Sequence, residues 1–257
     1  MDMLTISTGN GIWWCIMALM LLGIYGLHRG LKDRTAREQR KALLICGFVI
    51  FGMYFLQRFF MFRDPVFWEL YGSEEHAFLI NLLPLQLCYT GLMLTMVGLY
   101  KDHEPLMAFG FYAGLLGAFL AMVSPDGYYD RQSILHIPTL FFYLTHGLLV
   151  AAYACIGLLG LIRTGWKTAA KALGILILVT LVLHGINLTG HRFGLEGMNY
   201  CYTVSTGGSG LLELLWSWLP YPWIYVILPG SLFFCLWSLV LNSLLRLRKT
   251  RGSATYA

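Results

Sequence analysis

The sequence has few charged residues and lacks several familiar signatures. Only 12% of its 257 residues are charged, about half the usual share, whereas 58% are hydrophobic. The six cysteines show no Cys-x-x-Cys spacing, so neither a disulfide framework nor a zinc motif is indicated. No positively charged segment precedes the first apolar run, which argues against a cleaved signal peptide. These features exclude a soluble domain.

Seven apolar runs are long enough to cross a hydrocarbon layer of roughly 30 Å, which needs about 20 helical residues. They cover residues 11–28, 41–62, 78–99, 105–123, 134–162, 168–189 and 222–245. The runs leave no room for a separate soluble domain and show no internal repeat. The sequence therefore predicts an all-α fold, a single polytopic membrane bundle over residues 1–257 with seven transmembrane helices.

The distribution of Lys and Arg orients this predicted bundle. Fourteen of the 18 basic residues fall in the loops and tail of one side. By the positive-inside rule that side is cytoplasmic, so the N-terminus is expected outside and the C-terminus in the cytoplasm. The net charge of +5 is thus a topology signal and predicts no nucleic-acid partner.

The longest predicted outer connection is 190–221. It contains an apolar stretch, Leu211 to Leu219, that is too short to span a bilayer. We expect it to form an interfacial or re-entrant helix. Because the cytoplasmic loops are short and basic, function is expected in the outer half of the bundle.

The segment Leu82-Leu83-Pro84-Leu85-Gln86-Leu87-Cys88 is the most informative motif. A proline inside a spanning helix frees a backbone carbonyl that lipid cannot hydrogen-bond, so protein or water is expected around it. A thiol beside this opening could react with a lipid. The alternative is that Cys88 is a small apolar filler of the core.

Other polar residues are predicted near the same depth. Cys88 lies about 15 Å along its helix and His146 about 18 Å along another that runs in the same direction. The remaining polar candidates of the outer half are Arg58, Asn81, Gln86, His184, Asn187, Asn199 and Tyr200. Intramembrane polar groups usually face the bundle interior.

Each of these residues also has a structural interpretation. His146 could be a core histidine, Arg58 could extend to the headgroups, and His184 with Asn187 could join two helices. His136 and His191 lie near predicted outer ends and are expected at the interface.

The combination of thiol, imidazole and cationic or amide donors suits acyl transfer. A neighbouring imidazole that accepts the thiol proton makes cysteine a good nucleophile, and the donors could stabilise an oxyanion. His146 would be the base for Cys88.

The chain also resembles the YwaF-like integral membrane proteins, which include the transmembrane protein 164 branch. The resemblance rests on the succession of four short motifs, Pro84 to Cys88, Tyr143 to Gly147, Asn199-Tyr200 and Tyr221 to Tyr225. It implies phospholipid acyl-chain remodelling through an acyl-Cys intermediate and a His, here Cys88 and His146. The chain has Gln86 where the family has His, and Leu85 where the eukaryotic branch has its Cys. An alignment anchored on Pro84 would leave the chain without the nucleophile.

The first hypothesis is therefore a phospholipid acyltransferase or transacylase, a multi-pass protein of a bacterial plasma membrane whose partners are membrane phospholipids. Arg58, Asn81, Gln86, His184, Asn187, Asn199 and Tyr200 would bind or orient the substrate. No metal or cofactor is expected. The second hypothesis is a transporter, flippase or non-catalytic lipid-binding scaffold with the same cavity. A haem protein that uses His146 and His184 is disfavoured by their different depths, and the oligomeric state stays open.

Overall fold

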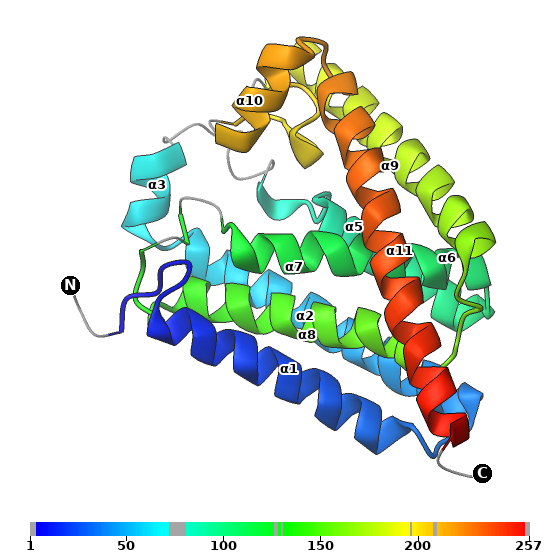
Figure 1. Cartoon of the computed structure of the whole chain (residues 1–257). Helices are drawn as coiled ribbons and strands as arrows, with labels where there is room; N and C mark the ends of the chain where they lie inside the picture. The colour runs from blue at the N-terminus through cyan, green and yellow to red at the C-terminus, as the bar shows by residue number, and fades with distance from the viewer. Residues whose placement is uncertain are drawn as a thin grey trace.

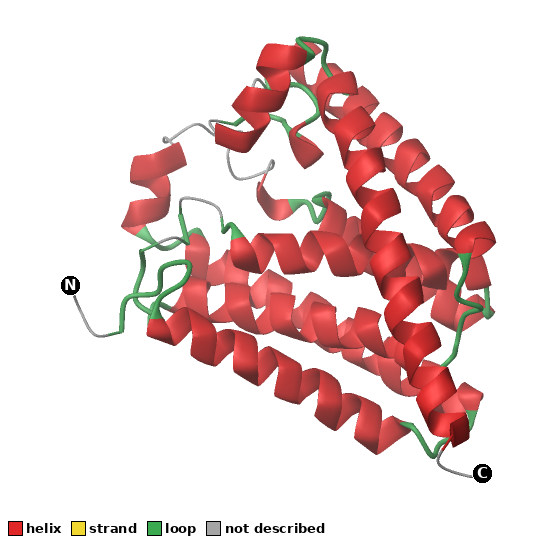
Figure 2. Cartoon of the chain, in the orientation of Figure 1, coloured by secondary structure: helices red, strands yellow, loops and turns green. Residues whose placement is uncertain are grey.

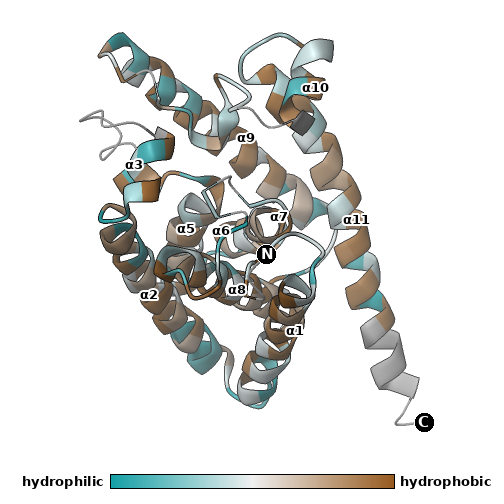
Figure 3. Ribbon diagram, turned by 90° about the vertical axis from the view of Figure 1, so that its left-hand side faces the viewer, coloured by the Kyte–Doolittle hydropathy of each residue, from teal (hydrophilic) through white to brown (hydrophobic). Residues whose placement is uncertain are grey.

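The computed structural model describes residues 4–71, 81–125, 128–129, 131–195, 197–207 and 210–254, and the regular elements of these ranges are helices (Figure 1, Figure 2). An isolated antiparallel bridge between Thr5 and Ser133 is the one strand-like pairing in the described part of the chain. Hydrophobic residues cover much of the length of the helices, and hydrophilic residues gather mainly toward their ends (Figure 3). The predicted all-α class is confirmed.

Six helical stretches are long and apolar enough to cross a membrane, among the residues searched. They are α1 (Gly11–Leu31), α2 (Ala36–Met61), the continuous stretch α6 (Glu104–Phe109), η1 (Gly110–Gly114) and α7 (Leu115–Val123), α8 (Ile137–Leu158), α9 (Trp166–Arg192) and α11 (Ile224–Ala254). Each overlaps a predicted run, so the chain is an integral, multi-pass membrane protein.

The third predicted run, 78–99, differs from the prediction. Residues 72–80 lie outside the described ranges, residues 83–86 are not helical, and α5 (Leu87–Lys101) has only 15 residues. Proline has no N–H to donate and disfavours a helical residue before it, so α5 begins only after Gln86, whose backbone is extended. The prediction that Pro84 lies inside a spanning helix is wrong. A seventh span and the orientation of the termini stay predictions.

Local signals in the sequence define the hairpin between α1 and α2. Thr35 and Glu38 form a reciprocal capping box, in which each side chain accepts a hydrogen bond from the other residue's backbone N–H. The Gln39 amide donates to the carbonyl of Leu31, at the end of α1, and to that of Arg34 in the turn that follows, at 3.0 Å each. These contacts explain why a short polar connection suffices here.

Helix α8 is the centre of the bundle and packs against α1, α2 and α7. Its Tyr153 ring occupies a space that Gly91, Gly110 and Gly114 leave open, because a Cβ atom at any of the three would meet this side chain within 3.2 Å. Gly110 and Gly114 are the first and last residues of the π-helical turn η1. π-helical turns are rare in proteins, and many of those that occur lie at functional sites.

The remaining long helices, α9 and α11, run along one side of the bundle, where α9 packs on α6 (Figure 1). Helices α9 and α11 pack on each other, and α11 also contacts the short helix α10 (Gly210–Trp218) (Figure 1). The predicted short helix in 190–221 is thus present as α10, although its depth in the membrane stays a prediction. Between α9 and α10 the chain forms the 3₁₀ turn η2 (Tyr200–Tyr202), and α3 (Pro65–Tyr71) follows α2.

Candidate functional site

Cys88 is the second residue of α5 and is buried, with 8% of its surface exposed. It follows the Pro84 segment, whose backbone carbonyls need partners. The Tyr54 hydroxyl on α2 is directed at the carbonyl oxygens of Asn81 and Leu82, at 3.2 and 3.1 Å. The predicted requirement for a polar neighbour beside the proline is therefore met by a side chain of α2.

The first turn of α5 presents N–H groups to the thiol. The backbone N–H groups of Cys88 and Tyr89 interact favourably with a negative charge on the Cys88 sulfur. The Tyr153 hydroxyl on α8 donates to the Cys88 carbonyl at 2.8 Å and holds this turn against the central helix. Burial of Cys88 opposes ionisation of its thiol, and the helix N-terminus, which favours negative charge, offsets part of that cost.

His146 lies on α8, is 4% exposed, and has one ring nitrogen committed. Its Nδ1 is 2.8 Å from the Phe142 carbonyl oxygen. Because a carbonyl only accepts, Nδ1 carries the proton and Nε2 presents a lone pair. The imidazole also meets the Tyr89 ring edge-on, with centroids 5.7 Å apart. Since Tyr89 follows Cys88 directly, His146 and Cys88 occupy one region of the bundle, although no described hydrogen bond joins them.

Arg58 on α2 points into the same region. Its guanidinium carbon lies 4.8 Å from the centre of the Tyr54 ring, and Nη1 contacts the Met61 sulfur at 3.0 Å. Its Nε is buried without a hydrogen-bond partner, and among the described ion pairs none involves Arg58. Its electrostatic partners include Cys88 and His146. Within the described ranges, Arg58 is therefore a cation without a carboxylate partner in the same region as the thiol and the imidazole.

Asn187 and His184 on α9 contact the loop that follows this helix, and their predicted role in substrate binding stays a prediction. The Asn187 amide donates to the Tyr200 carbonyl and the Thr203 hydroxyl, at 3.0 and 2.8 Å, and accepts from the Tyr200 N–H at 3.0 Å. His184 Nδ1 lies 3.2 Å from the Thr203 hydroxyl. These side chains are occupied in holding the loop that follows α9.

Asn199 holds the same loop from within. Its Oδ1 accepts from the N–H groups of Val204 and Ser205, and its Nδ2 donates to the Ser205 carbonyl at 2.8 Å. The Tyr225 hydroxyl of α11 donates to the carbonyls of Tyr202 and Ser205. The segment 199–205 is consequently fixed by both α9 and α11.

Gln86 and Tyr200 connect this loop with the thiol region. The Gln86 side-chain oxygen accepts from the Cys201 N–H at 3.3 Å. Tyr200 is 2% exposed and interacts electrostatically with Tyr54 and Arg58; burial raises its pKa to about 12. Cys201 was not a candidate from the sequence, because no local motif marks a residue that folding brings to α5.

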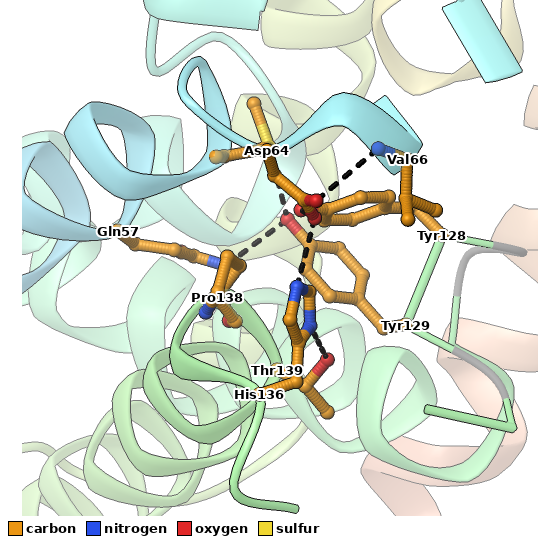
Figure 4. A network of polar contacts seen from close by, with 9 residues as sticks. Gln57, Asp64, Val66, Tyr128, Tyr129, His136, Pro138 and Thr139 are labelled. Atoms are coloured by element: carbon orange, nitrogen blue, oxygen red, sulfur yellow. Dashed lines mark hydrogen bonds and ion pairs between the residues drawn. The ribbon is translucent and has the colours of Figure 1, made fainter. Parts of the chain in front are cut away.

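A second polar network, shown in Figure 4, was also missed by sequence reasoning. The Asp64 carboxylate lies 2.8 Å from His136 Nε2 and accepts from the Tyr128 hydroxyl at 2.5 Å and from the Val66 N–H at 3.1 Å. His136 Nδ1 is 2.8 Å from the Thr139 hydroxyl. Burial acts to raise the pKa of Asp64, but these hydrogen bonds outweigh it and hold the pKa below its usual value. The network joins the end of α2 to the start of α8.

Gln57 extends this network toward His146. Its amide nitrogen donates to the Tyr129 hydroxyl at 3.0 Å and to the Pro138 carbonyl at 3.3 Å. Tyr129 stacks on Phe142, with centroids 4.2 Å apart, and Phe142 in turn contacts the imidazole. The two polar regions are therefore separated by aromatic rings.

Two apolar hollows lie elsewhere on the bundle. One, of about 500 Å³, is lined by residues of α9 and the loop after it, such as Val182 and Phe193. The other, of about 380 Å³, lies between α2 and α5, where Phe48 and Met96 line it. Neither is lined by Cys88 or His146. No group of three His, Cys, Asp or Glu residues suited to a metal ion is found in the described part of the chain.

Comparison with known proteins gives one match. The model of the TMEM164 family matches residues 4–241. Neither the curated proteins nor the solved structures give a match. Since the matched range is nearly the whole sequence, the chain belongs to the TMEM164 family.

Proposed function

We propose, with membership of the TMEM164 family as the premise, that this protein is a phospholipid acyltransferase or transacylase of a bacterial plasma membrane. The observation that supports the proposal is that Cys88 and His146 are buried and that the partly buried Arg58 interacts electrostatically with both. Intramembrane ionisable residues are costly and are retained chiefly for function. A thiol, an available imidazole nitrogen and a cation are the groups that acyl transfer from a phospholipid needs.

In the first half of the reaction, His146 Nε2 takes the thiol proton of Cys88. The thiolate attacks the ester carbonyl of the donor lipid, and the tetrahedral intermediate collapses to a Cys88 thioester. The leaving lysophospholipid alkoxide takes the proton back from the imidazolium. In the second half, His146 removes a proton from the acceptor hydroxyl, which attacks the thioester and releases the Cys88 thiolate.

The surrounding groups have supporting roles in this proposal. The N–H groups at the start of α5 would stabilise the oxyanion, because they face the sulfur that the carbonyl carbon approaches. Arg58 would bind the lipid phosphate, since its guanidinium has no carboxylate partner within the described ranges. His184, Asn187 and Asn199 would act through the loop that they hold, whereas Asn81 and Gln86 would line the approach to Cys88.

The test is intact-mass spectrometry of the purified protein after incubation with defined phospholipids, with wild type beside Cys88→Ala and His146→Gln. We expect a hydroxylamine-labile acyl adduct in the wild type, none in Cys88→Ala, and a much slower one in His146→Gln. Cys15→Ala is a matched control, because Cys15 is exposed and remote in the sequence from these motifs. Absence of an adduct with several lipid classes, while the wild type and Cys88→Ala still bind lipid, would favour the transporter or scaffold hypothesis.

A further inference from the structure

Two cysteines, far apart in the sequence, lie at the same end of α5. Cys88 is in its first turn, and Cys201 belongs to the loop between α9 and α10. The Cys201 N–H donates to the side chain of Gln86, the residue that precedes α5, at 3.3 Å. Both thiols are free in this structure. The fold therefore brings Cys201 to the N-terminal end of α5, next to the segment that carries the proposed nucleophile.

The sulfur atoms also share their surroundings. The Leu87 backbone and the Cys88 thiol both contribute to the electrostatic environment of the Cys201 thiol. Cys88 is buried, whereas Cys201 is only partly buried. Cys201 is therefore the thiol that a reagent would reach first.

The backbone at Cys201 supports a specific role for its position. Cys201 and Tyr202 both have positive φ, 57° and 55°, in a region that side chains with a Cβ rarely adopt. Such strain persists only where the surroundings over-determine it, and it clusters at functional sites. Here the hydrogen bonds of Asn187, Asn199 and Tyr225 provide that constraint.

We propose that Cys88 and Cys201 are a redox-active pair, which a small organic disulfide converts to an intramolecular disulfide that blocks the thiol of Cys88. In the first step the Cys201 thiolate attacks the reagent RSSR, forming a mixed disulfide and releasing one RSH. In the second step the Cys88 thiolate attacks the Cys201 sulfur and releases the second RSH. Overall, the two protein thiols lose two electrons and two protons, which reduce RSSR to two RSH molecules.

The rate of the first step depends on the thiolate population of Cys201. Burial raises the pKa of this thiol to about 12, so only a small fraction is ionised near neutral pH. Because thiolate is the reacting form, we expect the rate to rise about tenfold for each pH unit between 7 and 9. The pair would thus respond to sustained oxidising conditions and not to brief exposure.

The test uses the full chain in detergent micelles, treated with oxidised glutathione and analysed by intact mass and by peptide mapping of alkylated protein. We expect a loss of two hydrogens, a cross-linked peptide that contains Cys88 and Cys201, and recovery of both thiols with a reductant. Cys201→Ser should keep Cys88 open to alkylation after the same treatment, and Cys235→Ala should behave as wild type. A glutathione adduct on Cys201 without the cross-link, or equal cross-linking to other cysteines, would overturn the proposal.

The consequence for activity rests on the proposed function, and the two can fail separately. In the oxidised wild type, formation of the acyl adduct should stop, and a reductant should restore it. If the cross-link forms but the reduced protein takes up no acyl chain, the thiol pair stands and the acyl-transfer proposal fails. If the reduced protein is acylated but no cross-link forms, the acyl-transfer proposal stands and the thiol pair fails.

Discussion

Replacement of Gly114 by alanine should destabilise the bundle and displace the turn that carries Cys88. An added Cβ would lie 2.7 Å from Tyr153 Cζ and 2.8 Å from Cε2, closer than real Cβ contacts. The ring cannot easily retreat, because Gly91 and Gly110 enclose its other sides and its hydroxyl is bonded to the Cys88 carbonyl. Overpacking of this kind typically costs about 1–3 kcal/mol.

The matched control is Gly117→Ala, on the same continuous stretch of helix. Its Cβ would meet the Leu87 side chain at 3.6 Å, which is an ordinary van der Waals contact. Because alanine is a better helix former than glycine, this variant should be neutral or more stable by up to about 1 kcal/mol. Gly114→Ala is therefore expected to lower the free energy of unfolding, whereas its control should leave that energy unchanged or raise it.

The assay is denaturant unfolding in mixed micelles, followed by tryptophan fluorescence, together with the rate of acyl-adduct formation. A double-mutant cycle with Tyr153→Ala identifies the cause, since removal of the ring should relieve the clash and give a coupling energy of about 1 kcal/mol or more. If Gly114→Ala proved as stable and as fast as Gly117→Ala, the argument that Tyr153 fixes the Cys88 turn would be refuted.

Three further predictions follow from the polar contacts. Arg58→Met should keep the fold but weaken the binding of anionic phospholipids, measured by vesicle flotation, whereas Arg58→Lys should retain part of this binding. Binding by Arg58→Met equal to that of the wild type would refute the proposed phosphate contact. Asp64→Asn should lower the free energy of unfolding at pH 7, because the ionised carboxylate is what His136 and its neighbours stabilise. Since the pKa of Asp64 is depressed in the folded state, this difference from wild type should begin to shrink as pH falls below about 3.8 and vanish once pH is below the folded pKa. A difference that persists in stronger acid would contradict that account. Asn187→Ala should lower the free energy of unfolding by about 1–3 kcal/mol, because it leaves buried backbone groups of Tyr200 without partners. Proteolysis of the loop after α9 should become faster. An unchanged rate of proteolysis would show that α11 alone holds the loop.

For the thiol region, sequence reasoning expected Cys88 and His146 at similar depths, by counting along two helices at constant rise. Their roles stay predictions, and the count for Cys88 assumed a helix that starts near residue 78, whereas α5 begins at Leu87. Sequence reasoning misjudged Pro84, since composition shows that a segment is apolar but not whether a helix continues through the proline. Helix α5 begins at Leu87, and the position of Cys88 at a helix start follows from that break.

By itself the sequence determined the membrane class and six of the spans, because apolar length and sparse charge are local properties that each helix expresses independently. Only the tertiary structure decided the partners. Cys201 reaches α5 because α9 and α11 fix its loop, and His136 meets Asp64 because α8 packs on α2. Such contacts join residues distant in the chain, and no local pattern records which helix faces which.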